Sequence, residues 1–136
     1  SFIEGTRELL DTFGISYEVL TLSAHRSLDR TTAFAETAEE NGFAVIIACA
    51  GMAAHLPGVI AAKTILPVIG VPLPTSDIRG MDSLLAIVQM PSGVPVATMA
   101  IGKAGAKNAA ILAAEIIGRS NPAVQERLRV YKENLG

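Results

Sequence analysis

The sequence has few of the residues that build disulfides, metal centres and nucleic-acid grooves. It contains one cysteine in 136 residues, so no disulfide can form within the chain, and no group of cysteines and histidines has the spacing of a structural zinc site. Eleven basic side chains stand against 13 acidic ones, for a net charge of −2, and no block of Lys or Arg occurs. Nucleic acid is therefore not an expected partner.

Long hydrophobic runs are also absent. The most apolar stretch, residues 43–62, is interrupted by Gly51, His55, Pro57 and Gly58, which indicates strand, loop and helix rather than a membrane span. The first residues have neither the basic region nor the apolar run of a signal peptide. With a single cysteine, these features predict a cytoplasmic protein that does not associate with membranes.

Apolar residues, in contrast, are abundant. Half of its residues are apolar and only 18% are charged. The length suits one domain, residues 1–136, and the apolar excess predicts that some surface is buried between subunits. In the last predicted helix, at 121–136, a narrow apolar stripe of Val124, Leu128 and Tyr131 is expected to dock on a neighbouring subunit.

Helical and strand patterns alternate along the chain. Helices are predicted at residues 2–13, 27–41, 57–64, 81–90, 102–117 and 121–136, and strands at 17–22, 43–48, 66–71 and 94–101. The alternation predicts an α/β fold, a flavodoxin-like, doubly wound parallel sheet between two helix layers. Because such folds normally begin with a strand inside the sheet, we expect an amino-terminal strand and its loop to be missing from this sequence.

Two histidines, the only ones in the chain, follow two of the predicted strands. His25 stands in Ser-Ala-His-Arg at 23–26, and His55 lies in a run of small residues at 50–58. Open α/β sheets bind ligands at the carboxyl ends of their strands, and imidazole exchanges protons near neutral pH. The placement therefore predicts a functional site.

Each histidine motif has a functional and a structural interpretation. Beside a helix start, Arg26 and the helix amides would suit a phosphorylated substrate; alternatively Ser23 and Ser27 only cap the helix, and His25 and Arg26 are solvated loop residues. The small residues around His55 would admit a carboxylate or carbon dioxide, whereas the alternative is a buried imidazole bonded to a carbonyl. Neither motif by itself distinguishes its functional interpretation from its structural one.

Two further features carry weaker signals. Residues 102–105, Gly-Lys-Ala-Gly, resemble a phosphate loop only superficially, because the upstream Gly and the Ser or Thr after Lys of a Walker motif are absent. Cys49 follows a predicted buried strand and has no neighbouring base in the sequence, which favours an inert thiol.

Six motifs together resemble one family. They are Ser-Ala-His-Arg at 23–26, Ala-Ala-His-Leu-Pro-Gly at 53–58, Val-Ile-Gly-Val-Pro at 68–72, Asp-Ser-Leu at 82–84, Ile-Val-Gln-Met-Pro at 87–91 and Ala-Ile-Gly-Lys-Ala-Gly at 100–105. In this order, over about residues 15–118, the chain closely resembles the N5-carboxyaminoimidazole ribonucleotide mutase (PurE) family of purine biosynthesis.

The resemblance implies an isomerase without cofactor or metal. Its reaction would convert N5-carboxyaminoimidazole ribonucleotide to 4-carboxyaminoimidazole ribonucleotide by losing carbon dioxide in a closed site and adding it back at ring carbon four. It also implies a homo-oligomer, an octamer, with sites near subunit contacts. The alternatives are direct carboxylation of aminoimidazole ribonucleotide by the related branch, and a catalytically inactive subunit that still binds the ribonucleotide.

The resemblance also assigns site residues. His25 matches the general acid/base and Arg26 the binder of the ribonucleotide phosphate, and His55 fits the branch that does not use bicarbonate. The other residues implied to line the pocket are Ser23, Ala24, Ala50, Gly51, Ala53, Ala54 and Leu56. The family normally has a Gly-Ser-x-Ser-Asp loop after its first strand, which is not present here, and Cys49 and Met52 stand where glycines are common.

Overall fold

The computed structural model describes residues 2–52, 54–75 and 77–136, in which two helices come first, strands and helices then alternate, and a further helix ends the chain. The elements are α1 (Glu4–Thr12), α2 (Leu28–Thr37), β1 (Ile46–Ala50), α3 (Leu56–Ala61), β2 (Val68–Pro72), α4 (Met81–Val88), β3 (Ala97–Thr98), α5 (Lys103–Gly118) and α6 (Pro122–Glu133). All six predicted helices are present, with ends shifted by a few residues. Asn121 caps α6: its side-chain oxygen accepts the N–H of Val124 at 3.2 Å.

The three strands form a parallel sheet in the order β1-β2-β3. Ile46 pairs with Val68, and Ile69 pairs with Ala97. All five residues of β2 are buried, because this central strand has helices on both of its faces. The arrangement confirms the predicted α/β class, a parallel sheet between helix layers.

The predicted strand at 17–22 is wrong. Residues 15–23 belong to no helix or strand in the described part of the chain, and Val19 and Leu20 are more than half exposed. The residue pattern that predicted this strand concerns side chains only, whereas a strand also needs a neighbour for its backbone groups. In the described sheet, β1 pairs with β2 alone.

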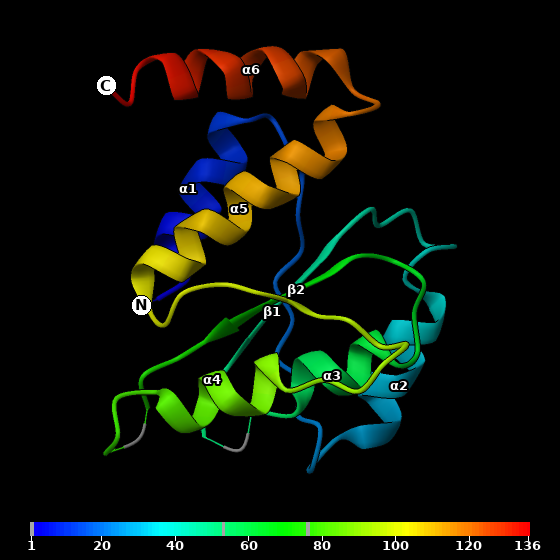
Figure 1. The fold of residues 1–136 in the computed structure, drawn as a ribbon. Helices are drawn as coiled ribbons and strands as arrows, with labels where there is room; N and C mark the ends of the chain where they lie inside the picture. Colours follow the sequence, from blue (N-terminus) through cyan, green and yellow to red (C-terminus); the bar gives the residue numbers. More distant parts are fainter. Residues whose placement is uncertain (1, 53, 76) are drawn as a thin grey trace.

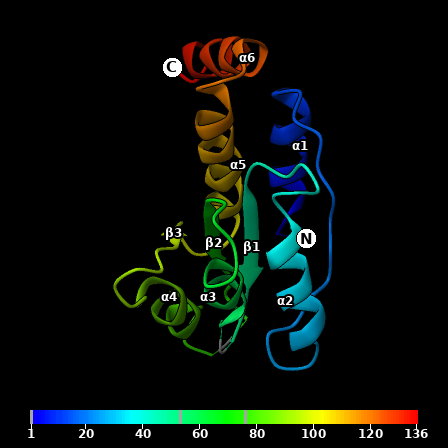
Figure 2. The same cartoon turned by 90° about the vertical axis from the view of Figure 1, so that its right-hand side faces the viewer.

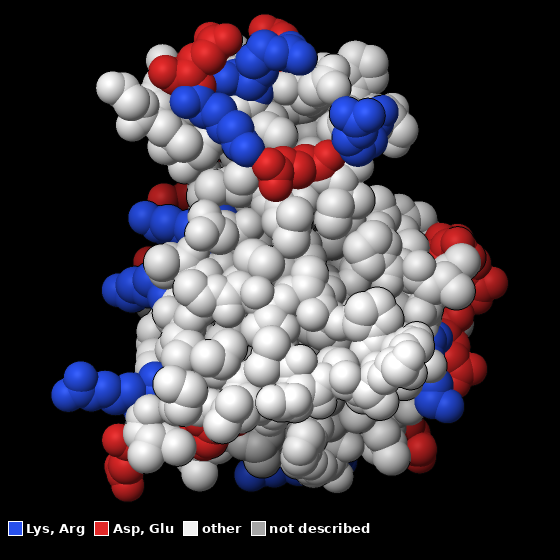
Figure 3. Space-filling view, viewed as in Figure 1, with Lys and Arg blue, Asp and Glu red and all other residues white. Residues whose placement is uncertain are grey.

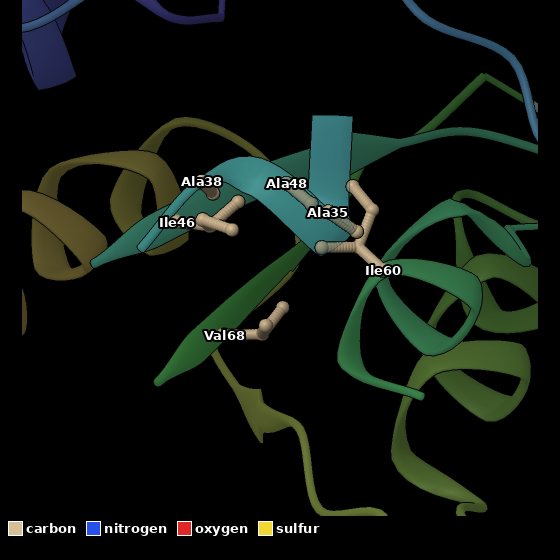
Figure 4. Packing of buried hydrophobic residues seen from close by; sticks show 6 residues of the cluster. All are labelled: Ala35, Ala38, Ile46, Ala48, Ile60 and Val68. Carbon is tan, nitrogen blue, oxygen red and sulfur yellow. The ribbon is translucent and has the colours of Figure 1, made fainter. Parts of the chain in front are cut away.

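One face of the sheet packs against α2 and α3. Ile46 and Ala48 of β1 and Val68 of β2 form one buried cluster with Ala35 of α2, its C-cap residue Ala38, and Ile60 of α3. Figure 4 shows Ile60 reaching from α3 toward Ala35. The helix α4 covers the same face, where Gly70 leaves room for Ile87. The views in Figures 1 and 2 show α3 and α4 together on this side.

The opposite face packs against α5. Three buried alanines of this helix, Ala106, Ala109 and Ala113, lie against Ile69 and Val71 of β2. Small side chains at this spacing bring the helix close to the sheet. The two helix layers make the fold doubly wound.

The helix α1 lies along α5, where the Thr6 hydroxyl donates to the Ala106 carbonyl, and α6 packs at the far end of α5 (Figure 1). Phe13 is fully buried there and meets Tyr131 edge to face, with ring centroids 5.4 Å apart. Val124 and Leu128 belong to the same cluster, so the stripe that the sequence assigned to a neighbouring subunit is covered within the chain. Among the residues that the structure describes, no helix is both long and apolar enough to span a membrane.

Candidate active site

The turn at residues 23–27 is organised by Ser23. Its Oγ accepts the backbone N–H groups of His25 at 3.3 Å and Arg26 at 3.1 Å. Its carbonyl accepts the hydroxyls of Ser27 and Thr31, both at 3.2 Å, and the Thr31 side chain is fully buried. Ser27 stands at the N-cap position of α2 but makes no side-chain cap bond, because its hydroxyl is used within the turn. The hydrogen bonds of Ser23 therefore fix the backbone of the turn, while the side chains of His25 and Arg26 are exposed.

The second histidine is fixed through its backbone at the start of α3. His55 is the N-cap residue of this helix, and its carbonyl accepts the N–H of Val59 at 3.0 Å. Its side chain makes no cap bond, and Pro57, in the first turn of the helix, is buried. The imidazole is thus exposed and available for other contacts.

The fold brings the two histidines together. Nε2 of His25 lies 3.0 Å from Nδ1 of His55, and the rings are edge to face at 83° with centroids 5.1 Å apart. A distance of 3.0 Å between ring nitrogens is a hydrogen bond, so one proton lies between them. This contact excludes the alternative in which His55 is buried against a carbonyl.

Arg26, the residue after His25, is an exposed cation. In the part of the chain that the structure describes, no ion pair or side-chain hydrogen bond engages its guanidinium. A guanidinium has five donors in a planar fork that matches phosphate or carboxylate oxygens. The site therefore combines a proton-exchanging pair with a free anion binder.

Thr75 contacts the loop that leads to His55, and the sequence analysis missed it. Its Oγ1 accepts the backbone N–H of Met52 at 3.0 Å, which joins the loop after β1 to the loop after β2. A Cβ at Gly51 would overlap Thr75 Oγ1, so this close approach requires glycine. The available signal was the place of Thr75 just after a second parallel strand, where sites of such sheets are expected.

The other predicted pocket residues differ in their surroundings. Ala24 and Ala50 are partly buried, and the Ala50 carbonyl accepts the N–H of Leu73 at 3.0 Å. Ala54 is only 1% exposed, and Leu56 packs against the core beneath α3. The prediction for Ala53 lies outside the described residues.

Cys49 lies behind the site, in the cluster between β1 and α5. Burial raises the pKa of its thiol to about 11, because the interior disfavours the thiolate. At neutral pH the group is a thiol, a poor nucleophile and metal ligand. Within residues 2–52, 54–75 and 77–136, no three His, Cys, Asp or Glu side chains are grouped so that they could hold a metal ion.

An open groove of about 550 Å³ between α2 and the end of α3 lies away from the histidines. It is lined in part by Glu36, Glu39 and Lys63, all exposed to solvent. None of the motifs described above faces it. We therefore place the candidate site at the histidine pair.

Fold and geometry together define a class: an α/β enzyme whose candidate site has two imidazoles in contact and an exposed guanidinium next to His25 in the sequence. These groups suit proton exchange and anion binding, and His55 follows the carboxyl end of β1. Comparison with known proteins gives the family. The AIR carboxylase family model matches residues 1–136. The chain belongs to this family.

Several relatives in this family are named N5-carboxyaminoimidazole ribonucleotide mutase. The protein of this name from Pseudomonas aeruginosa is 57% identical over 134 residues, covering 98% of this chain and 82% of that protein. The one from Escherichia coli K12 is 52% identical, covering 93% of this chain and 75% of that protein. Among solved structures, Treponema denticola PurE superposes with a TM-score of 0.83 at 27% identity, covering 97% of this chain and 81% of that chain.

Proposed function

We propose that this chain is an N5-carboxyaminoimidazole ribonucleotide mutase, an isomerase of purine biosynthesis. The observation that carries the proposal is the contact of His25 with His55, together with the exposed Arg26 that follows His25 in the same turn. It supplies a group that exchanges protons next to a group that binds a phosphate. Relatives 52–57% identical to the chain have the name of this enzyme.

His25 is the general acid/base. When the exocyclic nitrogen of the substrate loses carbon dioxide, the N–C bond breaks and the nitrogen takes a proton from the imidazolium of His25. Ring carbon four then attacks the carbon dioxide, and the C–H proton returns to the neutral imidazole. The two transfers balance, and one group performs both, which suits imidazole near pH 7.

The ribonucleotide phosphate binds Arg26, whose turn also presents Ser23 and Ala24. The base and the carboxylate lie along Ala50, Gly51, Ala53, Ala54, His55 and Leu56. The bond between Met52 and Thr75 supports this role, because it fixes the loop that follows β1. Small residues allow the backbone to approach the ligand closely.

The test is turnover by His25→Asn, measured with each carboxylated isomer as substrate. We expect kcat to fall by about 100-fold or more, the range for a general acid/base, while substrate still binds. Near-normal turnover would contradict the mechanism. The same assay separates the alternatives: native protein that uses aminoimidazole ribonucleotide and bicarbonate instead is a direct carboxylase, and one that binds without turnover is an inactive subunit.

We further propose that the protein works as a homo-oligomer, an octamer. Along α4, Met81, Leu85 and Val88 lie on one helix face, and each is about half exposed. Figure 3 shows this side of the molecule with its Lys, Arg, Asp and Glu side chains around the rim and over α6, leaving the centre uncharged. Such a face favours contact with a second copy of the chain.

The exposed site supports the same proposal. His25, Arg26 and His55 are all exposed in the single chain. An enzyme that releases carbon dioxide and uses it again benefits from a site closed to water. A neighbouring copy that covers this end of the sheet would supply the closure.

Leu85→Glu tests the interface. It places a charge on the apolar face of α4, so the mass in solution, measured by light scattering after gel filtration, should fall from that of an octamer, with loss of activity. Ile65→Glu makes the same change at an 82% exposed position elsewhere and should leave the mass unchanged. A native protein that is monomeric would contradict the proposal.

We place this activity in the cytoplasm. A raised pKa keeps Cys49 as a thiol, which is compatible with a reducing compartment. Fractionation of cells with an antibody against the chain tests the placement.

A further inference from the structure

We propose that His55 is a positioning residue: its Nδ1 accepts the Nε2–H of His25 and thereby makes Nδ1 of His25 the nitrogen that exchanges protons with the substrate. The inference rests on the proposed function, since it takes His25 as the acid/base. It adds the direction of a hydrogen bond, which fixes the tautomers of both rings. In an imidazole, the bond made by one nitrogen decides which form the other presents.

The 3.0 Å contact between the two ring nitrogens does not by itself give the direction of donation. Two neutral imidazoles can share one proton in either sense. If His55 donated from Nδ1, the Nε2 of His25 would have to be unprotonated. If His25 donates, His55 carries its own proton on Nε2.

The chemistry decides between these directions. The reaction starts with His25 as an acid, and an imidazolium carries a proton on each nitrogen. The contact then persists only if Nδ1 of His55 is the acceptor. After the Nδ1 proton of His25 passes to the substrate nitrogen, Nε2–H still donates to His55, and Nδ1 of His25 is ready to accept the proton from carbon four. One unchanged hydrogen bond therefore serves both transfers.

The backbone around His55 suits this role. The carbonyl of His55 accepts the first backbone bond of α3, and the buried Pro57 anchors the following turn. No cap bond occupies the imidazole, so its Nδ1 is free to accept from His25. The ring is held through its backbone and is not required for the helix.

Two substitutions test the hydrogen bond separately from the ring. His55→Asn places an amide oxygen near the position of Nδ1 and can still accept the bond, whereas His55→Phe keeps a ring without an acceptor. We expect His55→Phe to lower kcat by about 10- to 100-fold with KM changed less than about threefold, and His55→Asn to recover most of that loss. Both variants should fold, as circular dichroism will check, because the side chain is exposed and makes no cap bond.

Nitrogen-15 NMR of the imidazoles reads the tautomers directly. The chain has only two histidines, so labelled protein without a histidine tag gives two ring systems, and His55→Asn assigns them. We expect both neutral rings to be protonated at Nε2, and His25 to become a mixture of tautomers in His55→Phe. A proton on Nδ1 of His55 would overturn the proposal.

The kinetic outcomes separate this inference from the proposed function. Turnover by His25→Asn at a near-native rate defeats both. Loss of turnover in His25→Asn with native kcat in His55→Phe defeats only the positioning role. Equal losses in His55→Asn and His55→Phe, seen mainly as a raised KM, would show that His55 only lines the substrate pocket, and would also overturn it.

Discussion

The backbone N–H of Met52 donates a 3.0 Å hydrogen bond to Thr75 Oγ1, and this bond joins the loops that follow two neighbouring parallel strands. The position next to it, Gly51, lies so close to Thr75 that a side chain would overlap the hydroxyl. Because His55 lies four residues further on, the packing of Gly51 against Thr75 helps to set the position of one of the two imidazoles.

Gly51→Ala should therefore displace the His55 loop. We expect kcat/KM to fall by about 10-fold or more and the free energy of unfolding to fall by about 1–3 kcal/mol, the usual cost of overpacking. Adding Thr75→Gly removes the overlapping atoms and should recover part of both losses. A double-mutant cycle on activity and on urea unfolding measures the coupling, and additive effects would contradict the packing argument.

Ser23→Ala should loosen the turn that carries His25 and Arg26. The hydroxyl of Ser23 accepts both of their backbone N–H groups, and its loss should destabilise the protein by about 1 kcal/mol. Since the two side chains lose their fixed orientation, we expect kcat/KM to fall by about 10-fold. Ser23→Thr keeps the acceptor and should retain most of the activity.

A hydroxyl at the other end of α2 provides the control for Ser23→Ala. Thr37 Oγ1 donates to the Ala33 carbonyl at 2.8 Å, away from the histidines. Thr37→Val should change kcat/KM by less than about twofold. Equal effects of the two substitutions would mean that the turn at Ser23 has no special role.

Apolar periodicity predicted all six helices, but it placed the strands less well. The strand predicted at 43–48 is β1 at Ile46–Ala50, because Phe43 packs against the core from outside the hydrogen-bonded ladder. The strand predicted at 94–101 pairs only at Ala97–Thr98, although the backbone N–H of Met99 also donates to Gly70 O at 2.9 Å. Apolar residues indicate which segments are buried, whereas the extent of a strand depends on backbone hydrogen bonds to strands that are distant in sequence.

The same distinction holds for the site. The sequence placed His25 and His55 after two predicted strands, whose ends topology would bring to one edge. In the described structure only His55 follows a strand, β1, because residues 15–23 form none. The sequence did not predict the 3.0 Å contact of the two histidines, which depends on two side-chain conformations 30 residues apart. Thr75 was missed because a threonine in a proline-rich loop has no pattern of its own, and its partner is 23 positions away.

Arg26→Ala should weaken substrate binding more than turnover. Losing a charge-assisted bond to phosphate costs about 1.5–3 kcal/mol, so we expect KM to rise by roughly 10- to 100-fold with a smaller change in kcat. Arg30→Ala removes the same charge from an exposed position further along α2 and should raise KM by less than about twofold. An unchanged KM in Arg26→Ala, or equal increases in the two variants, would remove Arg26 from the site.

The raised pKa of Cys49 predicts how the free energy of unfolding changes with pH in the alkaline range. Its folded-state pKa is raised from 9.0 to about 11, so folding favours the neutral thiol. The resulting stabilisation is fully present below pH 9, where the thiol is neutral in both states. It is lost as pH rises toward 11, because only the unfolded chain gains the thiolate in this interval.

Between pH 8 and pH 11, the native protein should therefore lose about 2 kcal/mol more free energy of unfolding than Cys49→Ala loses. The cavity left by Cys49→Ala lowers stability at every pH, so it shifts the curve without changing this difference in slope. Urea unfolding of both proteins at pH 8, 9, 10 and 11 measures the effect, and the comparison cancels the other groups that titrate in this range. Parallel curves would show that the thiol of Cys49 ionises as freely in the folded protein as in the unfolded chain.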